Sequence, residues 1–298
     1  MSIILRMTWK ELLRKRVLLL TLIMTAAFLV AFWFIASSIG GELKQSGLDD
    51  TTNTLLLGRF SRGLFIVSLG FFFGSFVLAF LSIFSSSSVI SGEAELGVMQ
   101  ALMPRPLARW RWYAGRWLGY VSFGLLYALL LYSAILIIAG IHAAVPREWS
   151  SLIISYLLFA AVVPLLVSVS MLGSGYLSAV GNGVLMTMLY GGGWLGGMID
   201  KVSSQLGSFG ATMGDSLATI SGLLSLVMPA DGLQRFVMDR LYNFSSLQEF
   251  FDPNTYAGGL FSIFGIGMAP SNAFLWYALF YTLAALLLGL WRFQKKDL

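Results

Sequence analysis

Five stretches of the sequence are long and apolar enough to cross a lipid bilayer, which limits what the chain can fold into. A helix needs about 20 apolar residues to cross a hydrocarbon core of about 30 Å. Because 57% of the residues are hydrophobic and 11% are charged, a water-soluble globule would lack polar surface. We therefore expect an all-α polytopic membrane protein, with one transmembrane domain over residues 1–298. The five stretches contain no Asp, Glu, Lys, Arg or His: 17–37, 64–84, 117–139, 152–172 and 273–291.

A sixth uncharged stretch, 184–199, is shorter and rich in glycine, which predicts a thin or closely packed span. Six crossings would place both termini on one side of the membrane. Most of the 19 Lys and Arg residues then fall on that side, which the positive-inside rule identifies as the cytoplasm. We thus expect a multi-pass protein of the cell (plasma) membrane with both termini cytoplasmic. The net charge of +5 then reports orientation in the lipid bilayer, and we expect no nucleic-acid partner.

Three segments outside the spans also carry information. Residues 1–16 are too polar to span, but their apolar residues follow helical spacing and Arg6, Lys10 and Arg14 repeat every four residues on another face. This pattern predicts an amphipathic helix on the inner leaflet. Residues 200–271 form a long extracytoplasmic segment with apolar patches and a helix start at Pro229. Here we expect helices packed on the outer membrane surface or dipping into it.

Several kinds of chemistry lack the residues they need. The chain has no cysteine and one histidine, His142, so disulfides, thiolate metal sites and pairs of imidazoles are excluded. No lysine follows a glycine, which excludes a nucleotide-binding P-loop. An ion-coupled transporter usually needs an ionisable group inside the spans, and these six have none. A membrane-embedded enzyme is disfavoured because the sequence offers no metal-binding cluster and no general-base constellation, and His142 is its one histidine.

The cytoplasmic loop 85–116 is the candidate functional segment. Ser91 can cap a short helix whose first turn carries Glu93 and Glu95, and Pro104 with Pro106 would end it. Such a helix is either a solvated surface element or a docking surface for a partner, because its apolar middle is flanked by acids and arginines. The residue pattern alone leaves both interpretations open.

The same segment carries a family resemblance. Ser91-Gly92-Glu93-x-Glu95-x-Gly97, followed by Arg105-Pro106-Leu107-x-Arg109, resembles the inner loop of ABC-2 type transporter permeases. The amphipathic start resembles their elbow helix. The aromatic and basic ending 291–298 and Met228-Pro229-Ala230-Asp231 before the last span resemble further features of that family. The very glycine-rich fifth span, 184–199, departs from the family pattern.

The resemblance implies a permease subunit without its own ATPase site, and so a chain that is not an enzyme. A separate cytoplasmic ABC ATPase would bind ATP and Mg, and this chain would need no cofactor. Glu93, Glu95 and Gly97 would lie on a coupling helix in a groove of the ATPase, flanked by Arg105 and Arg109. The expected activity is export of a hydrophobic or amphipathic substrate. The alternatives are an ATPase-bound membrane scaffold or sensor without transport, and an ion-coupled secondary transporter.

The family resemblance also implies a second permease copy, as a homodimer or with a related permease. Gly192 and Gly196 have the four-residue spacing that lets helix backbones approach closely in lipid, and they are the candidate interface residues. The alternative is that these glycines pack against other spans of the same chain.

Overall fold

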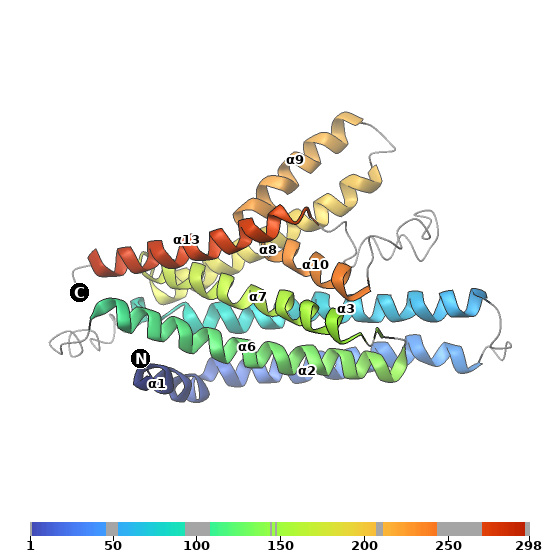
Figure 1. The fold of residues 1–298 in the computed structure, drawn as a ribbon, viewed down its shortest axis with the longest axis horizontal. Coiled ribbons are helices and arrows are strands. Elements are labelled where there is room, and N and C mark those ends of the chain that lie inside the picture. The colour runs from blue at the N-terminus through green and yellow to red at the C-terminus, as the bar shows by residue number, and fades with distance from the viewer. Residues whose placement is uncertain are drawn as a thin grey trace.

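The computed structural model describes residues 2–45, 53–92, 108–143, 145–146, 148–206, 211–242 and 270–295. Every regular element within these ranges is a helix, which confirms the all-α prediction. The helices are α1 (Ser2–Arg14), α2 (Arg16–Gln45), α3 (Asn53–Ser86), α6 (Arg109–His142), α7 (Trp149–Ser174), α8 (Ala179–Leu206), α9 (Ala211–Val227), α10 (Ala230–Tyr242) and α13 (Ala273–Lys295). Both ends of the chain lie at the same end of the helical bundle (Figure 1).

Among the residues that the structure describes, five helices are long and apolar enough to cross a membrane, and they contain the five predicted stretches. This supports a helical membrane protein. Residues 184–199 are helical within α8, but α8 is not among the five, so a sixth crossing stays a prediction. The five candidate spans are Arg16–Gly40, Arg62–Ser86, Arg109–His142, Trp149–Ser174 and Ala273–Lys295.

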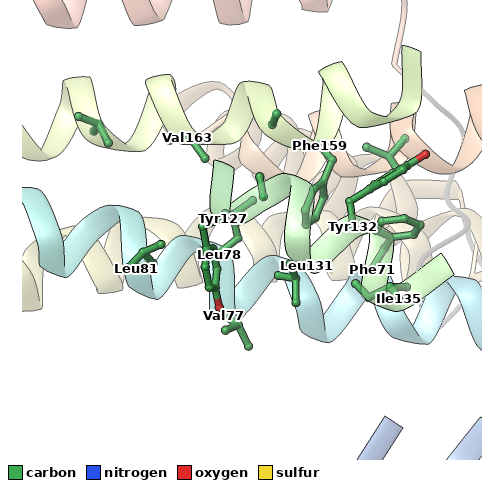
Figure 2. Packing of buried hydrophobic residues seen from close by; sticks show 14 of the residues in the cluster. Phe71, Val77, Leu78, Leu81, Tyr127, Leu131, Tyr132, Ile135, Phe159 and Val163 are labelled. Carbon is green, nitrogen blue, oxygen red and sulfur yellow. The ribbon is translucent and has the colours of Figure 1, made fainter. Parts of the chain in front are cut away.

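The core lies where α3, α6 and α7 meet (Figure 2). The ring of Phe71 on α3 is centred 5.3 Å from that of Tyr132 on α6 and 5.4 Å from that of Phe159 on α7. In contrast, α2 and α13 expose large apolar side chains such as Phe34 and Leu287, which suits contact with lipid. Of the five candidate spans, the one in α3 is the most buried.

Small residues let α3 approach its neighbours closely. A Cβ atom at Gly70 or Gly74 would lie 2.7 or 2.8 Å from the Ile135 side chain of α6. Ser68, Ser75 and Ser82 are buried and donate their hydroxyls to the carbonyls four residues earlier, at 2.7, 2.7 and 2.8 Å. Because these hydroxyls are satisfied within α3, they can lie in an apolar interior at low cost.

The helix predicted near the N-terminus is present as α1, which packs against the first half of α6. Thr8 and Leu12 are buried, and Cβ atoms at Gly115 and Gly119 would collide with Ile4 and Thr8. Trp9 on α1 donates its indole N–H to the Ser122 hydroxyl at 2.9 Å. The helix is confirmed, whereas its position on the inner leaflet stays a prediction.

Two helices from the predicted outer segment behave differently. The helix α9 packs against the later part of α8, and together they lean away from the bundle, whereas the start of α8 packs within it (Figure 1). The short helix α10 lies inside the bundle against α7, α8 and α3, and ten of its 13 residues are buried. The segment thus supplies an interior element as well as a projecting hairpin.

Candidate functional site

The predicted coupling segment is framed by described residues on both sides. Glu93, Glu95, Gly97 and Arg105 lie outside the described residues, so their predicted role is not tested. Arg109 is described, as is the chain up to Gly92. The structure therefore shows the residues that flank this segment on each side.

The residues directly before the 93–107 segment are bonded to the last turn of α7. Ser174 is fully buried, and its hydroxyl accepts hydrogen bonds from the backbone N–H groups of Ile90 at 2.9 Å and Ser91 at 3.2 Å. The hydroxyls of Ser91 and Ser174 lie 3.3 Å apart. Ser91, predicted as a helix cap, is thus bonded to Ser174, a partner that the sequence pattern does not reveal.

Asn182 of α8 reinforces this end. It is fully buried, and its amide donates to the carbonyl oxygens of Ser87, at 2.9 Å, and Ser170, at 2.8 Å. A Cβ at Gly173 would lie 2.1 Å from the Asn182 Oδ1 atom, so the glycine makes room for the amide. The end of α3, the end of α7 and the start of α8 are thereby held as one unit.

The residues directly after the 93–107 segment contact α13. Arg109 begins α6 and donates from its guanidinium to the carbonyl oxygen of Gln294 at 2.9 Å. One turn later, the ring of Trp112 stacks on Phe293 with centroids 5.1 Å apart. The two ends of the 93–107 segment are thus held by different helices, α7 with α8 on one side and α13 on the other.

A buried ion pair joins α1 to α6 beyond Arg109. Arg116 is 2% exposed and its guanidinium pairs with the carboxylate of Glu11, whose other oxygen lies 2.9 Å from the Lys15 ammonium. Arg116 also lies over the ring of Trp112, 5.4 Å from its centroid. Burial alone would raise the pKa of Glu11, but attraction to Arg116 and Lys15 holds that pKa below its usual range. This junction (Glu11, Lys15, Arg116) is called the α1–α6 joint below.

A second ionic cluster joins α10 to α8, with both of its α10 members buried. Arg235 is 6% exposed; its Nε donates to Asp231 at 2.8 Å and its terminal nitrogen pairs with Asp200 on α8. None of the predicted spans contains a charge, and Asp231 was predicted to lie at a helix start in the outer segment and in a family-like run before the last span. The available signal was the four-residue spacing of Asp231 and Arg235 directly after Pro229, which places both on one helix face. This cluster (Asp200, Asp231, Arg235) is called the α8–α10 joint below.

Glycines on α8 determine how closely α9 and α10 approach it. A Cβ at Gly197 would lie 2.0 Å from Asp231 Oδ2, and one at Gly193 would lie 2.6 Å from the Met228 carbonyl oxygen. At Gly196 the nearest atom would be Leu224 Cβ, at 2.6 Å, whereas at Gly192 nothing lies within 4 Å. Of the two candidate dimer residues, Gly196 therefore packs within the chain and Gly192 faces open space. The dimer itself stays a prediction.

His142 lies at the end of α6, where its Nδ1 is 3.0 Å from the Ile138 carbonyl oxygen and its ring meets Trp33 edge-on. In the part of the chain that the structure describes, no three His, Asp or Glu side chains are grouped to hold a metal ion.

No protein-family model matches this chain, and no curated protein gives a significant match to its sequence.

Proposed function

We propose that this chain is the membrane-spanning permease subunit of an ATP-driven ABC-2 type transporter. A separate cytoplasmic ATPase would bind ATP and Mg and dock on the 85–116 loop. The transported substrate would be hydrophobic or amphipathic, and it would leave the cell. The assembly would contain two permease chains and two ATPase chains in the plasma membrane.

The observation that supports this proposal most strongly is that the residues flanking the 93–107 segment on both sides are bonded to other helices. Ser91 is bonded to Ser174 of α7, and Arg109 to Gln294 of α13. A force applied to the segment by a partner would therefore act on at least two spans together. Packed helices respond to such forces by moving as rigid units. Coupling to an ATPase requires that the docking segment move several spans together, whereas a solvated surface helix needs no such connection to the spans.

The energy source follows from the same reasoning. If ATP hydrolysis supplies the energy from the cytoplasmic side, the spans need no titratable group of their own. The buried charges of the α8–α10 joint are paired with one another, as buried charges are when they serve a structural purpose. A scaffold or sensor would bind the same ATPase without moving a substrate.

The docking role is tested by charge reversal. Purified chain carrying Glu93→Lys and Glu95→Lys should lose the ATPase that co-purifies with the native chain, because like charges would face each other in the interface. Glu148→Lys is a matched control, since this exposed acid precedes α7 at the other end of the bundle. Undiminished retention of the ATPase by the doubly reversed chain contradicts the proposed docking site.

Transport is tested separately in reconstituted vesicles. The native pair should hydrolyse ATP faster when substrate is present and should move that substrate across the membrane. Binding of the ATPase without any transport would support the scaffold alternative.

Orientation is tested by single cysteines, which are unambiguous because the chain contains none. Cysteines at Gln45 and Asn243 should react with an impermeant reagent in intact cells. Labelling of these two sites only after permeabilisation would contradict the proposed topology.

A further inference from the structure

The exposed side of α1 carries an open pocket that the proposed function does not use. Met7, Lys10, Glu11, Arg14 and Lys15 line it, and its volume is ≈ 400 Å³. We propose that this pocket binds the phosphate head group of an anionic membrane lipid. The inference does not depend on an ATPase partner.

The charges of the pocket favour an anion. Its single acid, Glu11, is already paired with Arg116 and Lys15. Lys10 and Arg14 have no ion-pair partner among the residues that the structure describes, and both are exposed. A phosphate can accept charge-assisted hydrogen bonds from both side chains at once. The pocket therefore offers two uncommitted cations in front of a neutralised acid.

The position of the pocket points to a lipid as the source of that phosphate. Lys15 is followed at once by α2, whose apolar run begins at Val17, so the pocket lies at the level where a membrane span begins. Phospholipid phosphates occupy this level of a bilayer. Three apolar side chains of α1 are also exposed and could contact acyl chains: Ile3 at 82%, Met7 at 48% and Leu13 at 61%.

Occupancy of the pocket should strengthen the α1–α6 joint. Lys15 belongs both to the pocket and to the joint, where it shares Glu11 with Arg116. A phosphate bound in front of the joint would offset its surplus positive charge, because two cations there share one carboxylate. We therefore expect an anionic lipid to stabilise the packing of α1 against α6.

The test uses the full chain in a neutral detergent, where no membrane surface potential attracts anionic molecules in general. Short-chain phosphatidylglycerol is titrated against the native chain and against the Lys10→Gln/Arg14→Gln variant. Loss of both direct contacts should weaken binding at least about tenfold and remove the rise in melting temperature caused by the lipid. The matched control is Arg111→Gln/Lys295→Gln, which removes two exposed cations from the same end of the bundle. This control should bind the lipid like the native chain.

Three further arms complete the test. Phosphatidylcholine and inorganic phosphate, each titrated alone, should bind far more weakly than phosphatidylglycerol. The Lys10→Arg/Arg14→Lys variant keeps both charges and should keep binding, which guards against a folding defect in the glutamine variant. Equal weakening in the glutamine variant and its control would reduce the effect to diffuse attraction and overturn the proposal. Equally tight binding of inorganic phosphate would overturn the lipid as its source.

Discussion

Arg116 and Arg235 are both almost fully buried, and each ties a short helix to a long one. Arg116 on α6 binds α1 through Glu11, and Arg235 on α10 binds α8 through Asp200. The acids differ in exposure: the Glu11 side chain is 31% exposed, whereas in the α8–α10 joint Asp231 is 3% exposed and Asp200 is 43% exposed. The charge balance is also opposite, because two cations share one carboxylate in the α1–α6 joint and two carboxylates share one cation in the α8–α10 joint.

The comparison teaches that a buried arginine can make two kinds of junction. The α1–α6 joint is positively charged and partly open, so it can take a further anion from outside the chain. The α8–α10 joint is closed on the α8 side, where Gly197 leaves just enough room for Asp231. We expect the closed joint to depend far more strongly on its arginine, because Asp231, left without its cation, cannot reach water.

The largest effect is expected from Arg235→Met. The substitution leaves Asp231 buried without a cation and should lower the free energy of unfolding by about 3 to 5 kcal/mol. Titration with a denaturing detergent, followed by circular dichroism, measures this change. The Asp231→Asn/Arg235→Met double variant should recover much of the loss, since it removes the stranded charge. A small loss in the single variant would mean that Asp231 is not isolated from water.

A second effect should come from Gly197→Ala. The added methyl would lie against the Asp231 carboxylate and should destabilise the chain by about 1 to 3 kcal/mol through overpacking. Gly192→Ala is the control, because no atom lies within 4 Å of the added methyl. The same unfolding titration should show no loss in the control, or a small gain from the better helix propensity of alanine. Equal losses at both positions would contradict the tight fit at Gly197.

Arg116→Met should have a smaller effect than Arg235→Met. Glu11 keeps Lys15 and some contact with water, so about 1 to 2 kcal/mol should be lost, mainly from one charge-assisted hydrogen bond. The matched variant is Glu11→Gln/Arg116→Met, in which neither partner is charged. If Arg116→Met cost as much as Arg235→Met, the distinction between an open and a closed joint would fail.

The smallest effect should be a dependence on acid pH. The folded-state pKa of Glu11 lies below its usual value of 4.5, so its contribution to stability is complete above that value. The contribution is lost as the pH falls through the lowered pKa. The melting temperatures of the native chain and Glu11→Gln should therefore differ at pH 7 and converge as the pH is lowered well below 4.5. A constant difference between the two chains at both pH values would show that Glu11 does not act through its charge.

The spans could be predicted from sequence because each is a continuous apolar run, a property that residues 64–84 show without reference to any other part of the chain. The burial of α10 could not be predicted, because its charged residues are like those of a surface helix. The pairing of Arg235 with Asp200 on α8 is visible only in the folded chain. Ser174 and Asn182 were missed for the same reason. A single buried hydroxyl or amide gives no periodic signal, and its importance depends on which backbone groups the fold places opposite it.

The late position of α10 in the chain has a consequence for biogenesis. Three of its neighbours, α3, α7 and α8, precede it in the chain and are synthesised first, whereas α13, whose Phe274 lies against Gly232, follows it. A helix carrying Asp and Arg then has to enter an apolar environment. The four-residue spacing of Asp231 and Arg235 allows them to pair within α10 itself, before any neighbour is reached. Arg235 can thus be paired within α10 itself, and its contact with Asp200 adds a second pair once α8 and α10 are packed together.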